Sequence, residues 1–262
     1  MANNRYSKLI EKIFFDNYKK DSKRVEFVRG DIEKAAKVLK IALPKNLGDV
    51  IYSFRFRTEL PISIINLAGK DEEWLIKLAG RSSYCFSLEN KLEIVPNRNL
   101  AHSKILNSTP GVIHKYSLSD EQALLAILRY NRLLDIFLGI TCYSLQNHLR
   151  TTVPNLGQVE TDEIYIGLDK RGAHYVIPVQ AKGGNDKQGK VQIQQDIELC
   201  RNKFPSLICI PVAAQFMQDG KIALFSFEQE ETAIKITSER HYELVESHNL
   251  SDAELENYKM RK

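Results

Sequence analysis

The stretch from Gly157 to Gly184, GQVETDEIYIGLDKRGAHYVIPVQAKGG, decides the fold of the chain around it. Residues 158–168 and residues 174–182 are both rich in Val, Ile and Tyr, which is typical of β-strands. Residues 169–172, DKRG, have the composition of a turn. The sequence therefore predicts two neighbouring strands joined by a short turn.

Four polar side chains of this hairpin are expected to lie close together. Because strand side chains alternate between two faces, Glu160 and Asp162 share one face of the first strand. Gln180 and Lys182 likewise share one face of the second strand. If the strands pair, two carboxylates, a carboxamide and an ammonium group converge. Such a group can hold a divalent metal ion and activate water against a phosphodiester.

Asp162 and the run Gln180-Ala181-Lys182 resemble the motif of the PD-(D/E)xK nuclease superfamily, to which many type II restriction enzymes and junction resolvases belong. The resemblance covers about residues 120–227. It implies that Asp162 binds the metal, that Gln180 replaces the second acidic ligand, and that Lys182 is the catalytic lysine. It also implies Mg²⁺, with Mn²⁺ as a substitute, held in part by the Ala181 carbonyl.

The motif departs from the family pattern at two positions. Thr161, not Pro, precedes the aspartate, at a position that varies in the family. Gln180 stands where Glu or Asp is usual, as in branches with a QxK form. Because a neutral ligand removes a negative charge, Glu160 is expected to supply it as a further metal ligand. The alternative is that these residues form only the charged, solvent-exposed face of an edge hairpin.

The elements around the hairpin predict a mixed α/β fold with the αβββαβ core of restriction endonucleases. Ser119 or Asp120 is expected to cap a strongly apolar helix that ends at Gly139. Glu121 in its first turn has two explanations, a role at the metal or charge complementarity at the helix start. The other expected elements are a strand at 140–153, a helix at 190–203, and strands at 207–212, 222–227 and 233–236.

Phosphate contacts are expected from the strand at 140–153. Gln146, His148 and Arg150 share one of its faces. A guanidinium binds phosphate with two parallel hydrogen bonds, which favours Arg150 as a DNA contact. His148 is expected to touch phosphate or water near the metal, although a strand histidine is often simply hydrogen-bonded.

Residues 1–94 predict a DNA-binding domain. Helical patterns at 4–20, 32–40 and 50–57 precede strands at 73–79 and 83–94, with a turn expected at Glu89-Asn90. Helices followed by a hairpin indicate a winged helix that presents Arg55 and Arg57 to DNA. A helical cap packed on the nuclease core is the alternative. Residues 95–119 are expected to be a connector, and residues 120–262 the nuclease domain.

Composition bounds these predictions. The 262 residues are 43% apolar and 27% charged, as in a globular protein, and no run of eighteen apolar residues occurs. Residues 1–115 carry 21 Lys and Arg against 13 Asp and Glu, whereas the remainder carries 16 against 20. A basic half beside an acidic half suits DNA binding beside metal binding.

The cellular compartment is expected to be the cytoplasm. The first twenty residues are charged throughout and lack the apolar core of a signal peptide. The four cysteines lie in apolar runs without metal-binding spacing, which indicates reduced core residues.

The sequence thus predicts a Mg²⁺-dependent endonuclease of the restriction type that hydrolyses double-stranded DNA. The family leads us to expect a homodimer, since cutting both strands usually needs two sites. A non-catalytic DNA-binding regulator with a vestigial nuclease fold is one alternative. A structure-specific repair or junction nuclease is the other.

Overall fold

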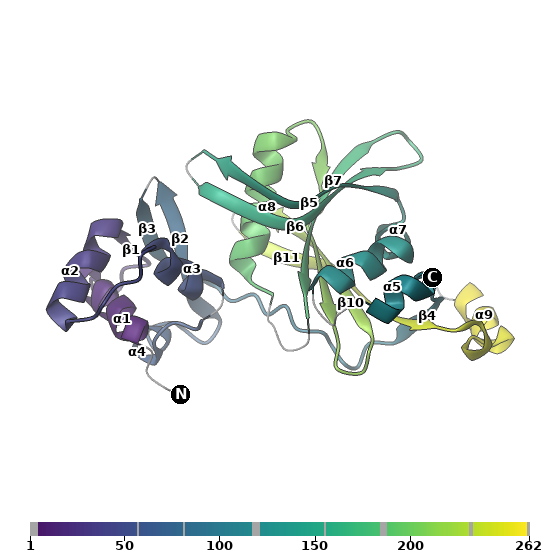
Figure 1. Cartoon of the computed structure of the whole chain (residues 1–262), viewed down its shortest axis with the longest axis horizontal. Helices are drawn as coiled ribbons and strands as arrows, with labels where there is room; N and C mark the ends of the chain where they lie inside the picture. Colours follow the sequence, from purple (N-terminus) through teal and green to yellow (C-terminus); the bar gives the residue numbers. More distant parts are fainter. Residues whose placement is uncertain are drawn as a thin grey trace. The chain divides into compact units, whose positions relative to one another are not determined.

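The chain forms two compact units in the computed structural model (Figure 1). The structure describes residues 5–56, 58–80, 82–116, 121–154, 156–183, 188–230 and 233–260. The first unit comprises Met1–Glu93 with Thr151–Val159, and the second comprises Ile94–Arg150 with Glu160–Lys262.

The first unit packs helices and a three-stranded antiparallel sheet around one apolar core. Its elements are α1 (Arg5–Asn17), β1 (Arg24–Val28), α2 (Arg29–Leu39), α3 (Gly48–Phe56), α4 (Ile62–Ile65), β2 (Glu72–Gly80) and β3 (Ser83–Asn90). Strand β3 lies between β1 and β2. Helix α1 has apolar residues at helical spacing, as the sequence predicts. The ring of its Phe14 packs edge-to-face against the rings of Trp74 in β2 and Phe86 in β3.

Two features of this sheet differ from the sequence prediction. Strand β1 was not expected, although its burial alternates strictly, with Val25 and Phe27 inside. The strand is only five residues long, and charged residues flank and interrupt its apolar pattern. The turn expected at Glu89-Asn90 is wrong, because both residues continue β3 and pair with β2. Cross-strand pairing therefore outweighed the local turn chemistry.

The second unit is built on a mixed sheet of eight strands, which confirms the expected mixed α/β fold at this level. The strand order is β4-β11-β10-β9-β7-β6-β5, with β8 also paired to β7. The strands are β4 (His102–Leu106), β5 (Thr141–Val153), β6 (Gly157–Leu168), β7 (His174–Lys182), β8 (Ile208–Cys209), β9 (Val212–Phe216), β10 (Ile222–Glu230) and β11 (Ala233–Val245). The helices are α5 (Gly111–Tyr116), α6 (Glu121–Tyr130), α7 (Leu133–Leu138), α8 (Lys190–Lys203), a 3₁₀ turn (Ser247–Asn249) and α9 (Asp252–Lys259).

Strand β7 is the centre of this sheet. It pairs antiparallel with β6 and parallel with β9, and α8 makes the crossover between the two parallel strands. Every residue from 176 to 181 is buried, so both faces of β7 are covered. Helix α6 shares a core with Val179 and Ala181, and α8 contacts β7 as well. Among the described residues, no helix combines the length and apolarity needed to cross a membrane.

The single helix expected after residue 120 is in fact two. Asn131 ends α6, where its side chain accepts from the Ser108 N–H and donates to Thr109 and to the Ile127 carbonyl. Arg132 then adopts a left-handed backbone with φ of 52°. Gly139 ends α7 in the left-handed conformation expected of a stop. The expected caps, Ser119 and Asp120, lie outside the described residues.

The end of the sheet is also more extended than predicted. The strand expected at 207–212 is divided into β8 and β9, because Pro211 interrupts the ladder. Strands β10 and β11 are longer than expected, and β11 pairs in parallel with β4. The region expected as a connector, 95–119, therefore contains a strand of the second unit.

Candidate active site

The predicted hairpin is formed by β6 and β7. Their antiparallel register runs from Leu168 opposite His174 to Glu163 opposite Val179. At the turn, Asp169 accepts hydrogen bonds from the backbone of Arg171 and Ala173. The candidate residues therefore come just beyond the regular ladder, at the end of the hairpin away from its turn.

Asp162 is fixed against the second strand of the hairpin. Its Oδ2 accepts a hydrogen bond of 2.8 Å from the backbone N–H of Ala181. Burial raises the pKa of Asp162, and the Ala181 N–H and the nearby Lys182 oppose that rise. The carboxylate of Glu121 raises the pKa of Asp162 further, and His148 lowers it. Asp162 thus lies among the charges expected of a metal site.

Lys182 connects this site to helix α6 through Glu121, the first residue of that helix. Its Nζ lies 3.7 Å from Oε1 of Glu121, and only 18% of the lysine side chain is exposed. The sequence left two explanations for Glu121 open. In the structure this carboxylate is close enough to Lys182 for an ion pair and interacts with Asp162. The site therefore contains two carboxylates, from β6 and α6, beside one ammonium group.

Gln180 turns toward helix α8. Its Nε2 lies 2.9 Å and 3.1 Å from the two carboxylate oxygens of Asp196, and 3.5 Å from Oγ1 of Thr161. All three residues are at most 1% exposed. Burial raises the pKa of Asp196 to about 8, against the hydrogen bond from Gln180. The nitrogen end of the predicted ligand is therefore already occupied.

Asp196 is a site residue that the sequence analysis missed. Its signal was present, because Asp196 shares a helical face with Ile193, Ile197 and Cys200, all buried. An acidic residue on the apolar face of a helix requires a buried partner. The identity of that partner depends on which face of β7 meets α8.

Glu160 is bound to Arg150 of β5 and lies near His148 of the same strand. Its Oε2 accepts from Nη2 of Arg150 at 2.7 Å and from Nε at 3.2 Å. Nδ1 of His148 lies 3.9 Å from its other oxygen. His148 has a left-handed backbone with φ of 47°, which interrupts the regular course of β5. The three residues form a partly exposed charged cluster on the β5–β6 arm.

In the first unit, Arg55 is half-buried on α3. Burial lowers the pKa of Arg55 to about 10, and nearby Tyr84 and Tyr52 oppose that change. Its guanidinium lies 4.8 Å from the ring centroid of Phe56, and Nε is buried without a hydrogen-bond partner. Arg57 lies outside the described residues.

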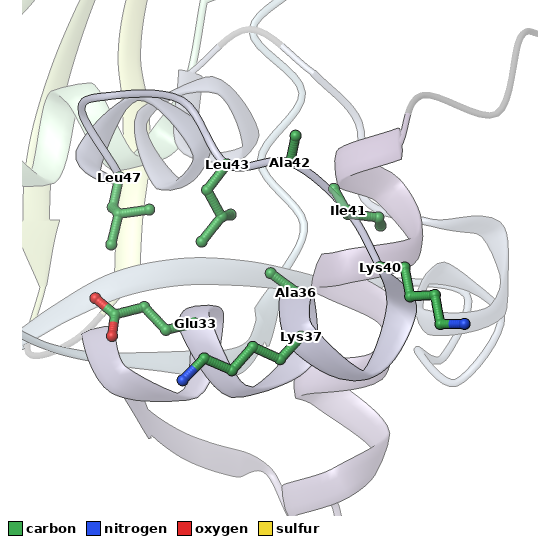
Figure 2. Close-up of a pocket in the computed structure, with 8 residues that line it drawn as sticks. All are labelled: Glu33, Ala36, Lys37, Lys40, Ile41, Ala42, Leu43 and Leu47. Carbon is green, nitrogen blue, oxygen red and sulfur yellow. The ribbon is translucent and has the colours of Figure 1, made fainter.

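The first unit also holds an open cavity of about 570 Å³ beside α2 (Figure 2). Figure 2 shows an apolar lining with three charged side chains, those of Glu33, Lys37 and Lys40. No predicted site residue lines this cavity. Its single carboxylate does not provide the paired acidic groups that metal chemistry requires.

The oxygen atoms around Asp162 are ligands of the kind that a hard cation prefers. Asp162, Glu121, the Gln180 carboxamide and the Ala181 carbonyl offer oxygen ligands, which Mg²⁺ prefers. Burial is the main cause of the raised pKa of Asp162, and the Glu121 carboxylate adds to it. A bound cation would stabilise the ionised form against both effects. Within the described part of the chain, no cluster of three His, Cys, Asp or Glu side chains is arranged to hold a metal.

Comparison of the chain with protein-family models, curated proteins and solved structures finds no match.

Proposed function

We propose that this protein is a metal-dependent DNA endonuclease of the restriction type, which hydrolyses phosphodiester bonds in double-stranded DNA. The observation that carries the proposal is the meeting of Asp162, Lys182 and Glu121 at the open end of the β6–β7 hairpin. Two oxygen ligands beside an ammonium group are suited to metal-assisted hydrolysis. The residues are those that the resemblance to the PD-(D/E)xK superfamily assigns to the site, with Glu121 added.

The topology around these residues supports the same proposal. Helix α6 precedes the meander β5, β6 and β7, and α8 then leads to β9, which is parallel to β7. With α7 and β8 set aside, this order agrees with the αβββαβ order expected for a restriction-endonuclease core. The candidate residues lie on β6, β7 and α6, three neighbouring elements of that order.

Each residue has a role that follows from its chemistry. Asp162, Glu121 and the Ala181 carbonyl would hold Mg²⁺, or Mn²⁺ in its place, with Gln180 as a neutral ligand. When bound, the ion polarises the phosphate and lowers the pKa of a bound water. Lys182 has three N–H donors with which to orient the attacking water or to stabilise the charge of the transition state. The short link from Ala181 to Asp162 holds the carboxylate still.

The first unit supports a role in DNA binding. Its element order and the place of β3 between β1 and β2 agree with a winged helix, in which α3 would face DNA. The excess of basic residues in 1–115 favours phosphate contacts. We further propose a homodimer, because two sites are needed to cut both strands, and a cytoplasmic setting, because the cysteines are free.

A second candidate is a DNA-binding regulator without catalytic activity. Two observations favour it. Gln180 directs its amide nitrogen to Asp196, and Glu160 is occupied by Arg150. A neutral amide at 180 and a Glu160 that is paired with Arg150 leave less negative charge for a metal than two free acids would. The presence of Asp162 and Lys182 at the same end of the β6–β7 hairpin argues for the enzyme.

The deciding experiment is incubation of the full chain with long mixed-sequence DNA in Mg²⁺, in Mn²⁺ or in EDTA. Discrete fragments that require metal support a restriction-type enzyme, and a smear indicates non-specific cleavage. Cleavage confined to branched or flapped substrates indicates a structure-specific nuclease. No product from any substrate, while DNA is still bound, indicates the regulator. Asp162→Asn is the inactive control, and Glu198→Gln, an exposed acid on α8, is its matched control outside the ligand set.

A further inference from the structure

The Gln180 carboxamide is oriented by a buried carboxylate. Both carboxylate oxygens of Asp196, on α8, accept hydrogen bonds from Nε2 of Gln180, at 2.9 Å and 3.1 Å. A carboxyl group keeps at least one acceptor oxygen whether or not it is protonated. The nitrogen end of the amide is therefore the end that faces α8.

The opposite end of the same group is left available. With Nε2 held at α8, Oε1 receives no hydrogen bond from the described part of the chain. The next two residues of β7 contribute the Ala181 N–H to Asp162 and the Lys182 ammonium to the site. An oxygen without a protein donor, one residue from this cluster, has the chemistry of a metal ligand.

We propose that Asp196 is a positioning residue, which holds the Gln180 carboxamide so that its oxygen and not its nitrogen is presented to the metal. The inference rests on the proposed function and extends it to a residue on α8. It also explains why Gln occupies a position where the family carries an acid. An ionised carboxylate at 180 has no N–H group to donate to the two oxygens of Asp196, so the contact that the amide makes would be lost.

A purely structural role for the pair predicts something different. In that case Asp196 and Gln180 would serve only to attach α8 to β7. Replacing Asp196 by Asn preserves that attachment, because Asn has the same shape and its oxygen still accepts from Nε2. Both oxygens of Asp196 face Nε2 in the structure, whereas Asn has one acceptor oxygen and an N–H donor that can bind Oε1 of the reversed amide. The substitution therefore weakens the preference for one orientation of the amide. Ligand positioning and attachment are thus separable.

The experiment measures binding of Mn²⁺ alone to the full chain, by calorimetry and electron paramagnetic resonance, together with thermal unfolding. The variants are Asp196→Asn, Gln180→Glu and the double variant. Glu198→Gln, an exposed position on the same helix, is the matched control. We expect Asp196→Asn to weaken Mn²⁺ binding by about tenfold or more, the usual effect of losing a group that orients a ligand, with little change in melting temperature. Glu198→Gln should bind as the wild type does.

The double variant tests the contact between residues 180 and 196 with the acid and the amide exchanged. Gln180→Glu alone should lower the melting temperature, and adding Asp196→Asn should restore it, since the amide introduced on α8 can donate to the new carboxylate. The double variant should also bind Mn²⁺ at least as tightly as the wild type. If Asp196→Asn binds Mn²⁺ normally while Asp162→Asn does not, the positioning role is refuted and the metal site stands. If the wild type itself binds no Mn²⁺, the proposed function and this inference fail together.

Discussion

The backbone N–H of Ala181 donates to the carboxylate of Asp162 at 2.8 Å, so that the acid of one strand is held by the residue next to the lysine of the other. This bond keeps the side chains of Asp162 and Lys182 at the same end of the hairpin. It also stabilises the ionised form of Asp162, although burial outweighs it and the net pKa is raised. The predictions below follow from this arrangement and from the charges near it.

Lys182→Ala should reduce DNA cleavage by about 10²–10⁴-fold while DNA binding persists. The lysine is expected to act on water or on transition-state charge, and an acid–base or charge-stabilising group contributes effects of this size. Single-turnover cleavage and filter binding on the same DNA separate the two properties. Lys190→Ala is unsuitable as a control because Lys190 is buried, so Lys170→Ala in the turn is used. Cleavage by Lys182→Ala at the wild-type rate would remove the lysine from the mechanism.

Asp162→Asn should abolish metal-dependent cleavage and weaken Mn²⁺ binding. The variant keeps the shape of the side chain and an oxygen that accepts from Ala181, so the hairpin should remain folded. It loses a negative charge, and Mg²⁺ gives up its bound water only reluctantly for neutral ligands. A metal titration of cleavage, with circular dichroism to check folding, measures the effect. A variant that cuts DNA with an unchanged metal requirement would show that the metal lies elsewhere.

Arg55→Gln should weaken binding to duplex DNA and reduce the dependence of affinity on salt by about one counterion. Its guanidinium has no carboxylate partner among the described residues, and no neighbouring acid therefore competes with a phosphate for it. Affinity is measured for the full chain at several salt concentrations. Arg171→Gln, paired with Asp169 in the hairpin turn, is the control. An unchanged slope would mean that Arg55 serves only the packing of α3.

Glu163→Ala should lower the free energy of unfolding by about 3 kcal/mol. Glu163 is fully buried, and Nε of Arg129 lies 3.0 Å from its Oε1. Removing the acid leaves a charged guanidinium without its partner, whereas the exposed pair of Glu198 and Arg201 contributes less than about 1 kcal/mol. Urea unfolding of Glu163→Ala and Glu198→Ala compares them. Equal losses would show that burial does not strengthen the first pair.

Asp169→Asn should destabilise the protein at neutral pH but not at low pH. The Ala173 N–H, followed by Arg171 and Tyr175, lowers the pKa of Asp169 to about 2 from its ordinary value of 3.8. The folded state therefore binds the proton less readily than the unfolded state. The contribution of Asp169 is complete above about pH 4 and is lost as the pH falls through about 2. Unfolding measured from about pH 6 to about pH 2.5 should show the two proteins converging. A constant difference would contradict the assignment.

The sequence predicted the centre of the second unit well. The bounds of β7 and α8 agree with those expected, because long apolar alternation and helical periodicity are strong local signals. The sequence-based prediction was wrong for elements whose bounds depend on contacts between residues far apart in the sequence. The break at Asn131 depends on hydrogen bonds to Ser108 and Thr109, which periodicity does not reveal. Strand β4 exists because β11 pairs with it.

The candidate site was predicted in part for a similar reason. Strand alternation placed Gln180 and Lys182 on one face, but their side chains reach different helices. Short, buried Gln180 meets Asp196 of α8, whereas the long, flexible Lys182 extends at the strand end toward Glu121 of α6. The alternation of side chains along a strand predicts the face from which each side chain leaves the backbone. It does not predict where the end of a long, flexible side chain lies.

The parallel pairing of β4 with β11 has a consequence for how the protein is made. His102 lies opposite His241, so an early strand of the second sheet cannot find its neighbour until most of the chain has left the ribosome. The strands of the first sheet, by contrast, all lie between residues 24 and 90 and are available early. If the protein cuts DNA as proposed, nascent and truncated chains would hold DNA-binding elements without a finished catalytic sheet. Cutting would then begin only after β11 has been synthesised.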